Sequence, residues 1–266
     1  MKKVALFGVP RSGTSWLSQL FNSHPSIALR FQPLFSFEHK ERLNMSSSFE
    51  DIDAFFNEIL NSSDEMALMT SRAHKGYPSF VKSDIPSTVM FKETRYLNLV
   101  EHLLAEDCSL KIIGIIRNPL STIASWYKAP KEFDPRWSIF EEWKYANKKN
   151  QGRDEEFYGF YKWLEVTRMF VDLEKKYPLQ FKIVKYSDLN DNTESTIRSL
   201  FDFLSLKVES QTIDFIQQSK SRHDDDPYSV YRAKANDQAW KDILPIEISD
   251  EIQKLLSDYQ LEDYLV

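Results

Sequence analysis

Residues 3–16, with the sequence KVALFGVPRSGTSW, determine how the chain begins to fold. The apolar run from Lys3 to Val9 is typical of a buried parallel strand. A turn rich in Gly, Pro and Ser follows, and apolar residues then recur at helical spacing over residues 16–21. The segment therefore predicts a strand, a tight turn and a helix in succession.

Working outward from this unit, further apolar runs predict strands near residues 89–91, 110–116 and 181–186. Periodic segments predict helices at 49–60, 96–104, from Pro119 onward, and at 137–149, 155–176, 193–204 and 248–259. Strands that alternate with helices form a parallel sheet covered on both faces. With no repeat and no flexible linker, we expect one α/β domain over residues 1–266.

Composition excludes several classes of protein. The 266 residues are 42% hydrophobic and 28% charged, as in an ordinary globular protein rather than a disordered, collagen-like or membrane protein. The net charge of −6 argues against a general nucleic-acid or anionic-membrane binder, although it allows a local basic cleft. The lone Cys108 suits a reducing compartment, and no apolar run approaches the ~18 residues of a membrane span. We expect a cytoplasmic protein with no membrane span and no nucleic-acid partner.

Residues 8–15, GVPRSGTS, match the phosphate-loop pattern G-x-x-x-x-G-K-[ST] except at the lysine, where Thr14 stands. Backbone N–H groups of such a turn at a helix N-terminus form an anion site. Arg11 supplies a cation from inside the loop. The missing lysine makes the loop poorly suited to ATP with magnesium.

Residues 10–16, PRSGTSW, resemble the 5′-phosphosulfate loop of the sulfotransferases that use 3′-phosphoadenosine 5′-phosphosulfate (PAPS). The resemblance implies that Arg11 contacts the 5′-phosphate and the bridging oxygen, and that Trp16 stacks on adenine. It implies a P-loop nucleotide-kinase-like three-layer sandwich. The residues implied to cradle the phosphosulfate are Ser12, Gly13, Thr14 and Ser15.

A second motif, IIRNP at residues 115–119, follows the clearest predicted strand. In the family, an arginine at this strand end and a serine eight residues later grip the 3′-phosphate of PAPS. Arg117 and Ser125 have this spacing, and Ser121, one helical turn before Ser125, could substitute or assist. The alternative is an arginine that only caps the sheet.

Two weaker segments complete the resemblance. Residues 184–189, VKYSDL, are similar to the family strand whose tyrosine lies near adenine, which implies that role for Tyr186 unless it is an ordinary sheet residue. Arg232 and Lys234, upstream of Trp240, resemble the basic loop that closes over the cofactor. Their alternative is a pair of solvated charges.

The acceptor must lose a proton to a positioned base. Residues 91–95, FKETR, occupy the family position for this chemistry, which implies that Lys92 stabilises the bridging oxygen and that Glu93 is the base. Thr94 stands where small-molecule enzymes have histidine, and Glu93 could instead pair with a nearby cation. Several bacterial relatives place the base after the first helix, where Glu38 and His39 are the alternatives.

We therefore predict transfer of a sulfuryl group from PAPS to a hydroxyl or amine of a small molecule or glycan, leaving 3′-phosphoadenosine 5′-phosphate (PAP), with no metal required. A carbohydrate or glycolipid is favoured as acceptor. The alternatives are a P-loop nucleotide kinase or NTPase and a catalytically silent nucleotide-binding scaffold. Candidate aromatic platforms for the acceptor are Trp126, Tyr127, Trp137, Phe140, Trp143, Tyr158 and Phe160.

Overall fold

Five parallel strands form one sheet, in the order β2-β3-β1-β4-β5. The computed structural model describes residues 1–70, 77–224, 226, 228–231 and 237–265. The strands are β1 (Lys2–Phe7), β2 (Ile27–Phe31), β3 (Thr88–Glu93), β4 (Lys111–Ile116) and β5 (Phe181–Lys185). The prediction of a parallel α/β sheet is confirmed.

The first strand lies at the centre of the sheet, and its side chains alternate between two cores. Ala5 is in register with Phe91 on one side and with Ile112 on the other. Ala5 and Phe7 are buried in one apolar cluster, whereas Val4 and Leu6 are buried in a second cluster across the sheet. Each face of the sheet therefore needs its own layer of helices.

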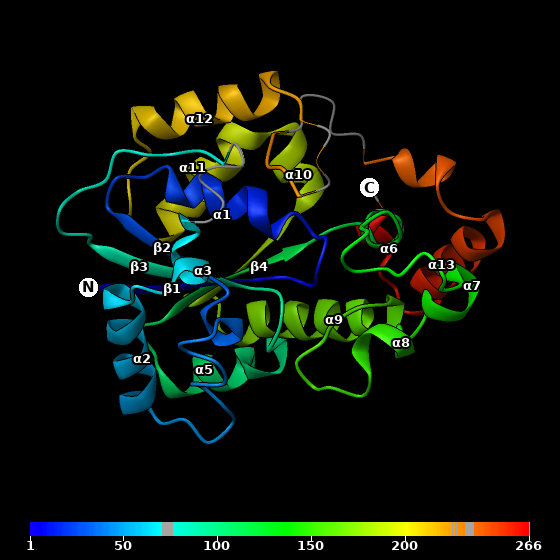
Figure 1. Ribbon diagram of the computed structural model, residues 1–266, viewed down its shortest axis with the longest axis horizontal. Helices are drawn as coiled ribbons and strands as arrows, with labels where there is room; N and C mark the ends of the chain where they lie inside the picture. Colours follow the sequence, from blue (N-terminus) through cyan, green and yellow to red (C-terminus); the bar gives the residue numbers. More distant parts are fainter. Residues whose placement is uncertain (71–76, 225, 227, 232–236, 266) are drawn as a thin grey trace.

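Figure 1 shows these two layers, one above and one below the sheet. The upper layer contains α1 (Thr14–Asn22), α10 (Tyr186–Asp191), α11 (Thr193–Phe203) and α12 (Ser210–Ser221). The lower layer contains α2 (Phe49–Asn61), α5 (Val100–Glu106) and α9 (Phe160–Lys176). To the right lie α6 (Pro119–Tyr127), α7 (Ile139–Glu142), α8 (Asn147–Asn150) and α13 (Ile246–Asp258). The three-layer sandwich expected from the sequence is confirmed.

Shorter elements complete the connections. They are α3 (Glu65–Leu68) and the 3-10 turns η1 (Pro33–Phe35), η2 (Leu97–Leu99), η3 (Ala239–Asp242) and η4 (Glu262–Tyr264). Within the described part of the chain, no helix has the length and apolarity needed to cross a membrane.

Several elements differ from the sequence-based expectation. Strand β2 and helix α12 were not predicted. Arg30 interrupts the apolar run of β2, and its guanidinium donates to the carbonyl oxygens of Ile59 and Leu60 at the end of α2. The edge strand is thus stabilised by a contact with a helix about thirty residues away in sequence.

The helix expected over residues 137–149 is instead two short helices, because the chain turns at Ala146 with φ 50°. Helix α9 begins at Phe160 rather than at residue 155. The residue before it, Gly159, has φ 87°, and a Cβ there would lie 2.8 Å from the carbonyl oxygen of Lys144. This close approach and the left-handed backbone favour glycine and delay the start of the helix.

Parallel strands bring their carboxyl ends to one edge of the sheet, where α/β proteins bind ligands. The segments that leave this edge are the Gly8–Gly13 loop after β1, Gln32 after β2, Lys92 and Glu93 ending β3, Arg117 after β4 and Tyr186 after β5. The sheet topology therefore assembles the site from five separate segments.

Candidate active site

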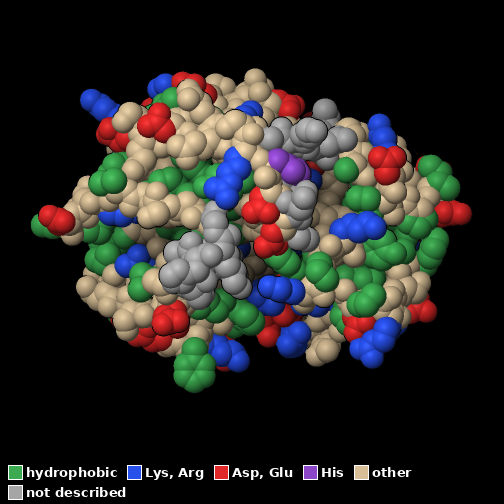
Figure 2. All heavy atoms as spheres, turned by 45° about the horizontal axis from the view of Figure 1, so that its top comes forward, with side chains coloured by type: hydrophobic (Ala, Val, Ile, Leu, Met, Phe, Trp, Pro, Cys, Tyr) green, Lys and Arg blue, Asp and Glu red, His purple; other side chains and the backbone are tan. Residues whose placement is uncertain are grey.

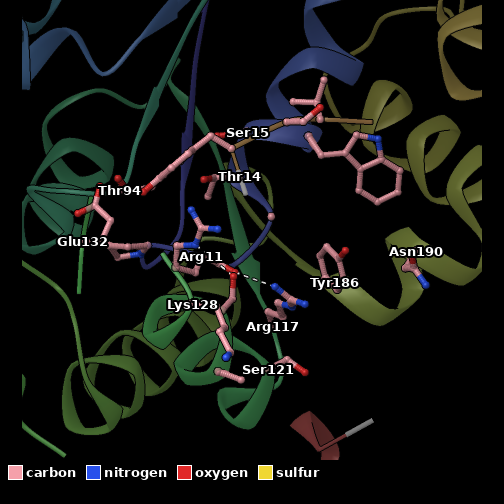
Figure 3. Close-up of a pocket in the computed structure, with 18 of the residues that line it drawn as sticks. Arg11, Thr14, Ser15, Thr94, Arg117, Ser121, Lys128, Glu132, Tyr186 and Asn190 are labelled. Atoms are coloured by element: carbon pink, nitrogen blue, oxygen red, sulfur yellow. Dashed lines mark hydrogen bonds between the residues drawn. The ribbon is translucent and has the colours of Figure 1, made fainter. Parts of the chain in front are cut away.

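A cavity of about 700 Å³ opens at this carboxyl edge. Its lining includes Arg11, Trp16 and Lys92 together with Arg117 and Tyr186. Figure 3 shows Arg11 in the middle of the view, with Thr94 and Glu132 to one side and Tyr186 and Asn190 to the other. The cavity therefore has two ends, with the arginine between them.

The loop after β1 begins the cavity wall. Gly13 precedes α1 with φ 90°, and a Cβ on it would lie 2.5 Å from the Tyr186 ring, so both backbone and space require glycine here. No side chain caps the N-terminus of α1, and the buried Ser12 hydroxyl has no hydrogen-bond partner among the described residues. These free donors, beside the positive end of a helix dipole, suit a phosphate or sulfate group.

Arg11 is the cation of this loop, and it adopts φ 73°. Its Nε donates to Ser125 Oγ at 3.1 Å, and its carbonyl oxygen accepts from Arg117 Nη1 at 3.0 Å (Figure 3). Burial lowers the pKa of the Arg11 guanidinium. The loop and helix α6 are thus joined through two arginines.

The Arg117 guanidinium makes three kinds of contact. It lies 4.5 Å from the Tyr186 ring centroid, donates to the carbonyl of Arg11, and pairs with Asp237 Oδ1 at 2.6 Å. The Ser121 hydroxyl donates to the carbonyl oxygen of Asp237. Arg117, Ser121 and Ser125 all line the cavity, so the structure brings both predicted serines to the arginine's surroundings.

Trp16 and Tyr186 meet edge to face, with ring centroids 6.2 Å apart. The indole Nε1 of Trp16 donates to Ser219 Oγ at 3.2 Å, which fixes the ring against α12. Asn190 lies on the same side of the cavity as Tyr186 (Figure 3), and Lys220 and His223 also line the cavity. Two aromatic rings next to the loop after β1 have the chemistry to contact a nucleobase.

The other end of the cavity contains Glu132, the one acid among the described residues that line it. Its Oε2 accepts from Lys149 Nζ at 2.6 Å and from the Tyr158 hydroxyl at 2.7 Å. Burial alone would raise the pKa of this carboxyl, but these two donors outweigh burial and leave the pKa below its usual value. Glu132 is therefore an ionised hydrogen-bond acceptor facing the cavity.

Strand alternation separates Lys92 from Glu93. Lys92 lines the cavity with its Nζ 4.3 Å from the Phe31 ring centroid. Glu93 follows Val89 and Phe91 onto the opposite face, is fully buried, and accepts from the backbone N–H of Leu34 at 2.9 Å. The structure therefore places Glu93 outside the cavity lining, contrary to its predicted role as the base, because consecutive strand residues point to opposite faces.

Glu38 and His39 also lie outside the cavity lining. Glu38 accepts from Ser62 Oγ at 2.6 Å, and the His39 ring packs edge to face on Phe55 of α2. Both residues belong to the connection that covers α2, not to the carboxyl edge. Arg232 and Lys234 lie outside the described residues.

Basic side chains outnumber acidic ones around the cavity, although the chain as a whole is acidic. The basic residues in its lining are Arg11, Lys92, Arg95, Arg117, Lys128 and Lys220. In the view of Figure 2, lysine and arginine side chains lie near the middle of the surface, with a few acidic side chains between them. The local field therefore favours an anionic ligand.

Several lining residues lie outside the sequence motifs: Gln32, Asn190, Ser219, His223, Tyr228 and above all Glu132. Glu132 follows α6 in a turn, where no local pattern marks it. Only Tyr158, among the aromatic platforms named above, lines the cavity. Trp126, Trp143 and Phe160 are buried core residues.

A basic cavity at the carboxyl edge of a parallel sheet, beside an uncapped helix N-terminus, is typical of an α/β protein that binds an anionic ligand. The family model described as a sulfotransferase domain matches residues 1–263. The chain therefore belongs to the sulfotransferase family and is a PAPS-dependent sulfotransferase, with PAPS as donor and PAP as product. This family assignment replaces the alternatives, which were a nucleotide kinase, an NTPase and a catalytically silent scaffold.

Solved structures share the fold. A mouse sulfotransferase, SULT7A1, crystallised with PAP, is 16% identical with a TM-score of 0.55, over 99% of this chain and 89% of that one. The sulfotransferase domain of the curacin biosynthetic pathway is 17% identical with a TM-score of 0.57, over 97% of each chain. A sulfotransferase from Alicyclobacillus acidocaldarius is 16% identical with a TM-score of 0.53, over 100% and 96%. No curated protein sequence matches this chain significantly.

The burial of Glu93 makes a prediction about stability. Burial raises the pKa of Glu93 to about 8, from an ordinary 4.5, although Lys92 and the N–H of Leu34 oppose the shift. Between these values the folded state holds a proton that the unfolded state has lost, so this residue's contribution to stability falls as pH rises. Glu93→Gln keeps an acceptor for Leu34 and removes the titration.

We expect urea denaturation to show the variant gaining stability relative to wild type as pH rises from about 4.5 to about 8. Glu38→Gln, which makes the same substitution at a half-exposed carboxylate, is the control. If the difference in free energy of unfolding between Glu93→Gln and wild type did not change with pH, burial would not raise the pKa of Glu93 as expected.

Proposed function

We propose that this sulfotransferase transfers its sulfuryl group to a hydroxyl, or to an amine, of a carbohydrate or glycolipid, with a cavity carboxylate as base. The observation that carries the proposal is the continuity of one cavity. It joins an anion-binding end, built on the α1 N-terminus and Arg117, to a polar end that contains Glu132. Donor and acceptor can therefore meet inside it.

The described residues fit a nucleotide with separate 5′ and 3′ anionic groups. In the proposed arrangement, the uncapped α1 N-terminus and the unpartnered Ser12 hydroxyl hold the 5′-phosphosulfate. Arg117, with Ser121 and Ser125, holds the 3′-phosphate. The Trp16–Tyr186 pair contacts adenine. PAPS, when bound, supplies the activated sulfuryl group.

Arg11 and Lys92 are the cations proposed to act on the reacting centre. In-line transfer builds negative charge on the leaving phosphate oxygen, and cations aimed at that oxygen stabilise the transition state. Arg11 stands between the two ends of the cavity, and Lys92 reaches it from the end of β3. Both are positioned before the ligand arrives, so little reorganisation is needed.

Glu132 replaces Glu93 as the proposed base. It is an ionised carboxylate at the polar end, held by Lys149 and Tyr158 through a single oxygen, Oε2. A loose transition state delays proton loss from the acceptor, so a carboxylate of low pKa can still orient the acceptor O–H and take its proton late. Its second oxygen, Oε1, is the one available for this bond.

The polar end also favours a polyhydroxylated acceptor over an apolar one. Gln32, Thr94, Arg95 and Glu132 line it, with the Tyr158 ring beside them. These groups can form further hydrogen bonds with the hydroxyls of a sugar, whereas a steroid offers few such partners and would exclude water from them. We also propose a cytoplasmic location, because the lone Cys108 is exposed as a free thiol.

A panel of acceptors tests the substrate class. We expect PAP release from PAPS to be faster with sugars and glycolipids than with phenols or steroids at equal concentration. The reason is that sugars offer several hydroxyls to the polar groups around Glu132, whereas phenols and steroids offer few. Faster release with a steroid, under conditions where the sugars are inactive, would overturn the carbohydrate assignment.

Arg117→Ala should weaken PAP binding by roughly 1.5–3 kcal/mol, the usual scale of a hydrogen bond to a charged group. Binding of adenosine 5′-monophosphate, which lacks the 3′-phosphate, should change much less. Isothermal titration calorimetry measures both. Arg168→Ala, which removes the same charge from an exposed position on α9, is the control. Equal losses of affinity for PAP and for adenosine 5′-monophosphate would show that Arg117 does not contact the 3′-phosphate.

Glu132→Gln should lower kcat on the order of a hundredfold, within the usual range for loss of a general base. PAP affinity should remain close to wild type, because the change lies at the opposite end of the cavity. Glu93→Gln should keep near-normal turnover, because its side chain does not reach the cavity. Steady-state kinetics with a true acceptor decides between Glu132 and Glu93 as the base. A large loss of kcat in Glu93→Gln with normal turnover in Glu132→Gln would show that Glu93 is the base.

A further inference from the structure

The corner proposed for the 3′-phosphate already contains an acidic group. Both Nε and Nη2 of Arg117 lie 2.6 Å from Asp237 Oδ1. The Ser121 hydroxyl, a second member of this corner, donates to the carbonyl oxygen of Asp237. Asp237 lies two residues before η3, which packs against α6. A single residue therefore engages two of the groups assigned to the phosphate.

This contact is shielded from water. The exposed fraction of the side chain is 16% for Arg117 and 13% for Asp237. A charge-assisted hydrogen bond in such a setting is stronger than one on the surface. The third nitrogen, Arg117 Nη1, is bonded to the Arg11 carbonyl, so the guanidinium has a protein partner at every nitrogen.

The carboxylate itself is only half satisfied. Asp237 Oδ2 is buried and has no hydrogen-bond partner among the described residues. A buried acceptor without a partner costs free energy. The Arg117–Asp237 ion pair is therefore strong, but it leaves one buried carboxylate oxygen without a hydrogen bond. A ligand with more negative charge and more oxygen atoms can displace Asp237 from Arg117.

We propose that Asp237 is an internal competitor for the 3′-phosphate and thereby sets the affinity of the site for its nucleotide. The inference rests on the proposed placement of the 3′-phosphate at Arg117. A carboxylate and a phosphate dianion cannot share one guanidinium edge without strong repulsion. Nucleotide binding must therefore displace the carboxylate, and its return to Arg117 favours departure of PAP after each turnover.

The competition has a chemical signature. It lowers affinity only for ligands that carry a 3′-phosphate, because a nucleotide without this group leaves the Arg117–Asp237 pair in place. PAP and adenosine 5′-monophosphate differ only in that phosphate. The ratio of their affinities therefore isolates the effect of Asp237 from general changes in the cavity.

The test is Asp237→Asn, which keeps the shape of the side chain and removes its charge. We expect calorimetry to show PAP binding on the order of tenfold tighter than wild type, with adenosine 5′-monophosphate nearly unchanged. Asp242→Asn removes an exposed carboxylate of η3 and should leave both affinities unchanged. Asp237→Ala should also tighten PAP binding, which separates loss of the competitor from any new bond made by the amide.

Two results would overturn the inference: unchanged or weaker PAP binding in both Asp237 variants, or an equal gain for both nucleotides. Failure of the underlying function gives a different outcome. In that case wild type itself would bind PAP no more tightly than adenosine 5′-monophosphate, and Arg117→Ala would not discriminate between them.

Discussion

The Arg117 guanidinium is the point on which the arrangement of the site depends. It follows β4, donates to the Arg11 carbonyl in the loop after β1, stacks on Tyr186 after β5, and pairs with Asp237 near the C-terminus. Four segments far apart in sequence are thus held by one planar group. Arginine suits this role because its fixed fork of donors and its flat face can be used at the same time.

The charge around the cavity is opposite in sign to the net charge of the chain. The chain carries a net charge of −6, yet the described lining of the cavity has six basic residues and a single acid. Backbone groups add to this field, because α1 begins at the cavity without a side-chain cap. An overall acidic chain can therefore bind a polyanionic nucleotide, since interactions across a shielded cavity outweigh those with distant surface charges.

The two ends of the cavity are built from different kinds of segment. The anion-binding end is built on strand ends and on the first turn of α1, which are rigid elements. The polar end draws on Gln32, Thr94 and Glu132, which lie in connections. Connections tolerate change better than strands do, so the acceptor end in the proposed function lies in the part of the fold that can change most easily.

The sequence alone determined the parallel α/β class and the position of the glycine-containing loop between β1 and α1, because these follow from local patterns of turn, strand and helix. Only the tertiary structure decided which carboxylate faces the cavity. Side chains alternate between the two faces of the sheet along β3, so Glu93 points into the core on the face away from the cavity. A turn after α6 brings Glu132 to Lys149 and Tyr158. It also decided that Asp237 meets Arg117 across 120 residues. The hydrophobic periodicity of the sequence does not predict such contacts, because they depend on how the layers pack and not on neighbours along the chain.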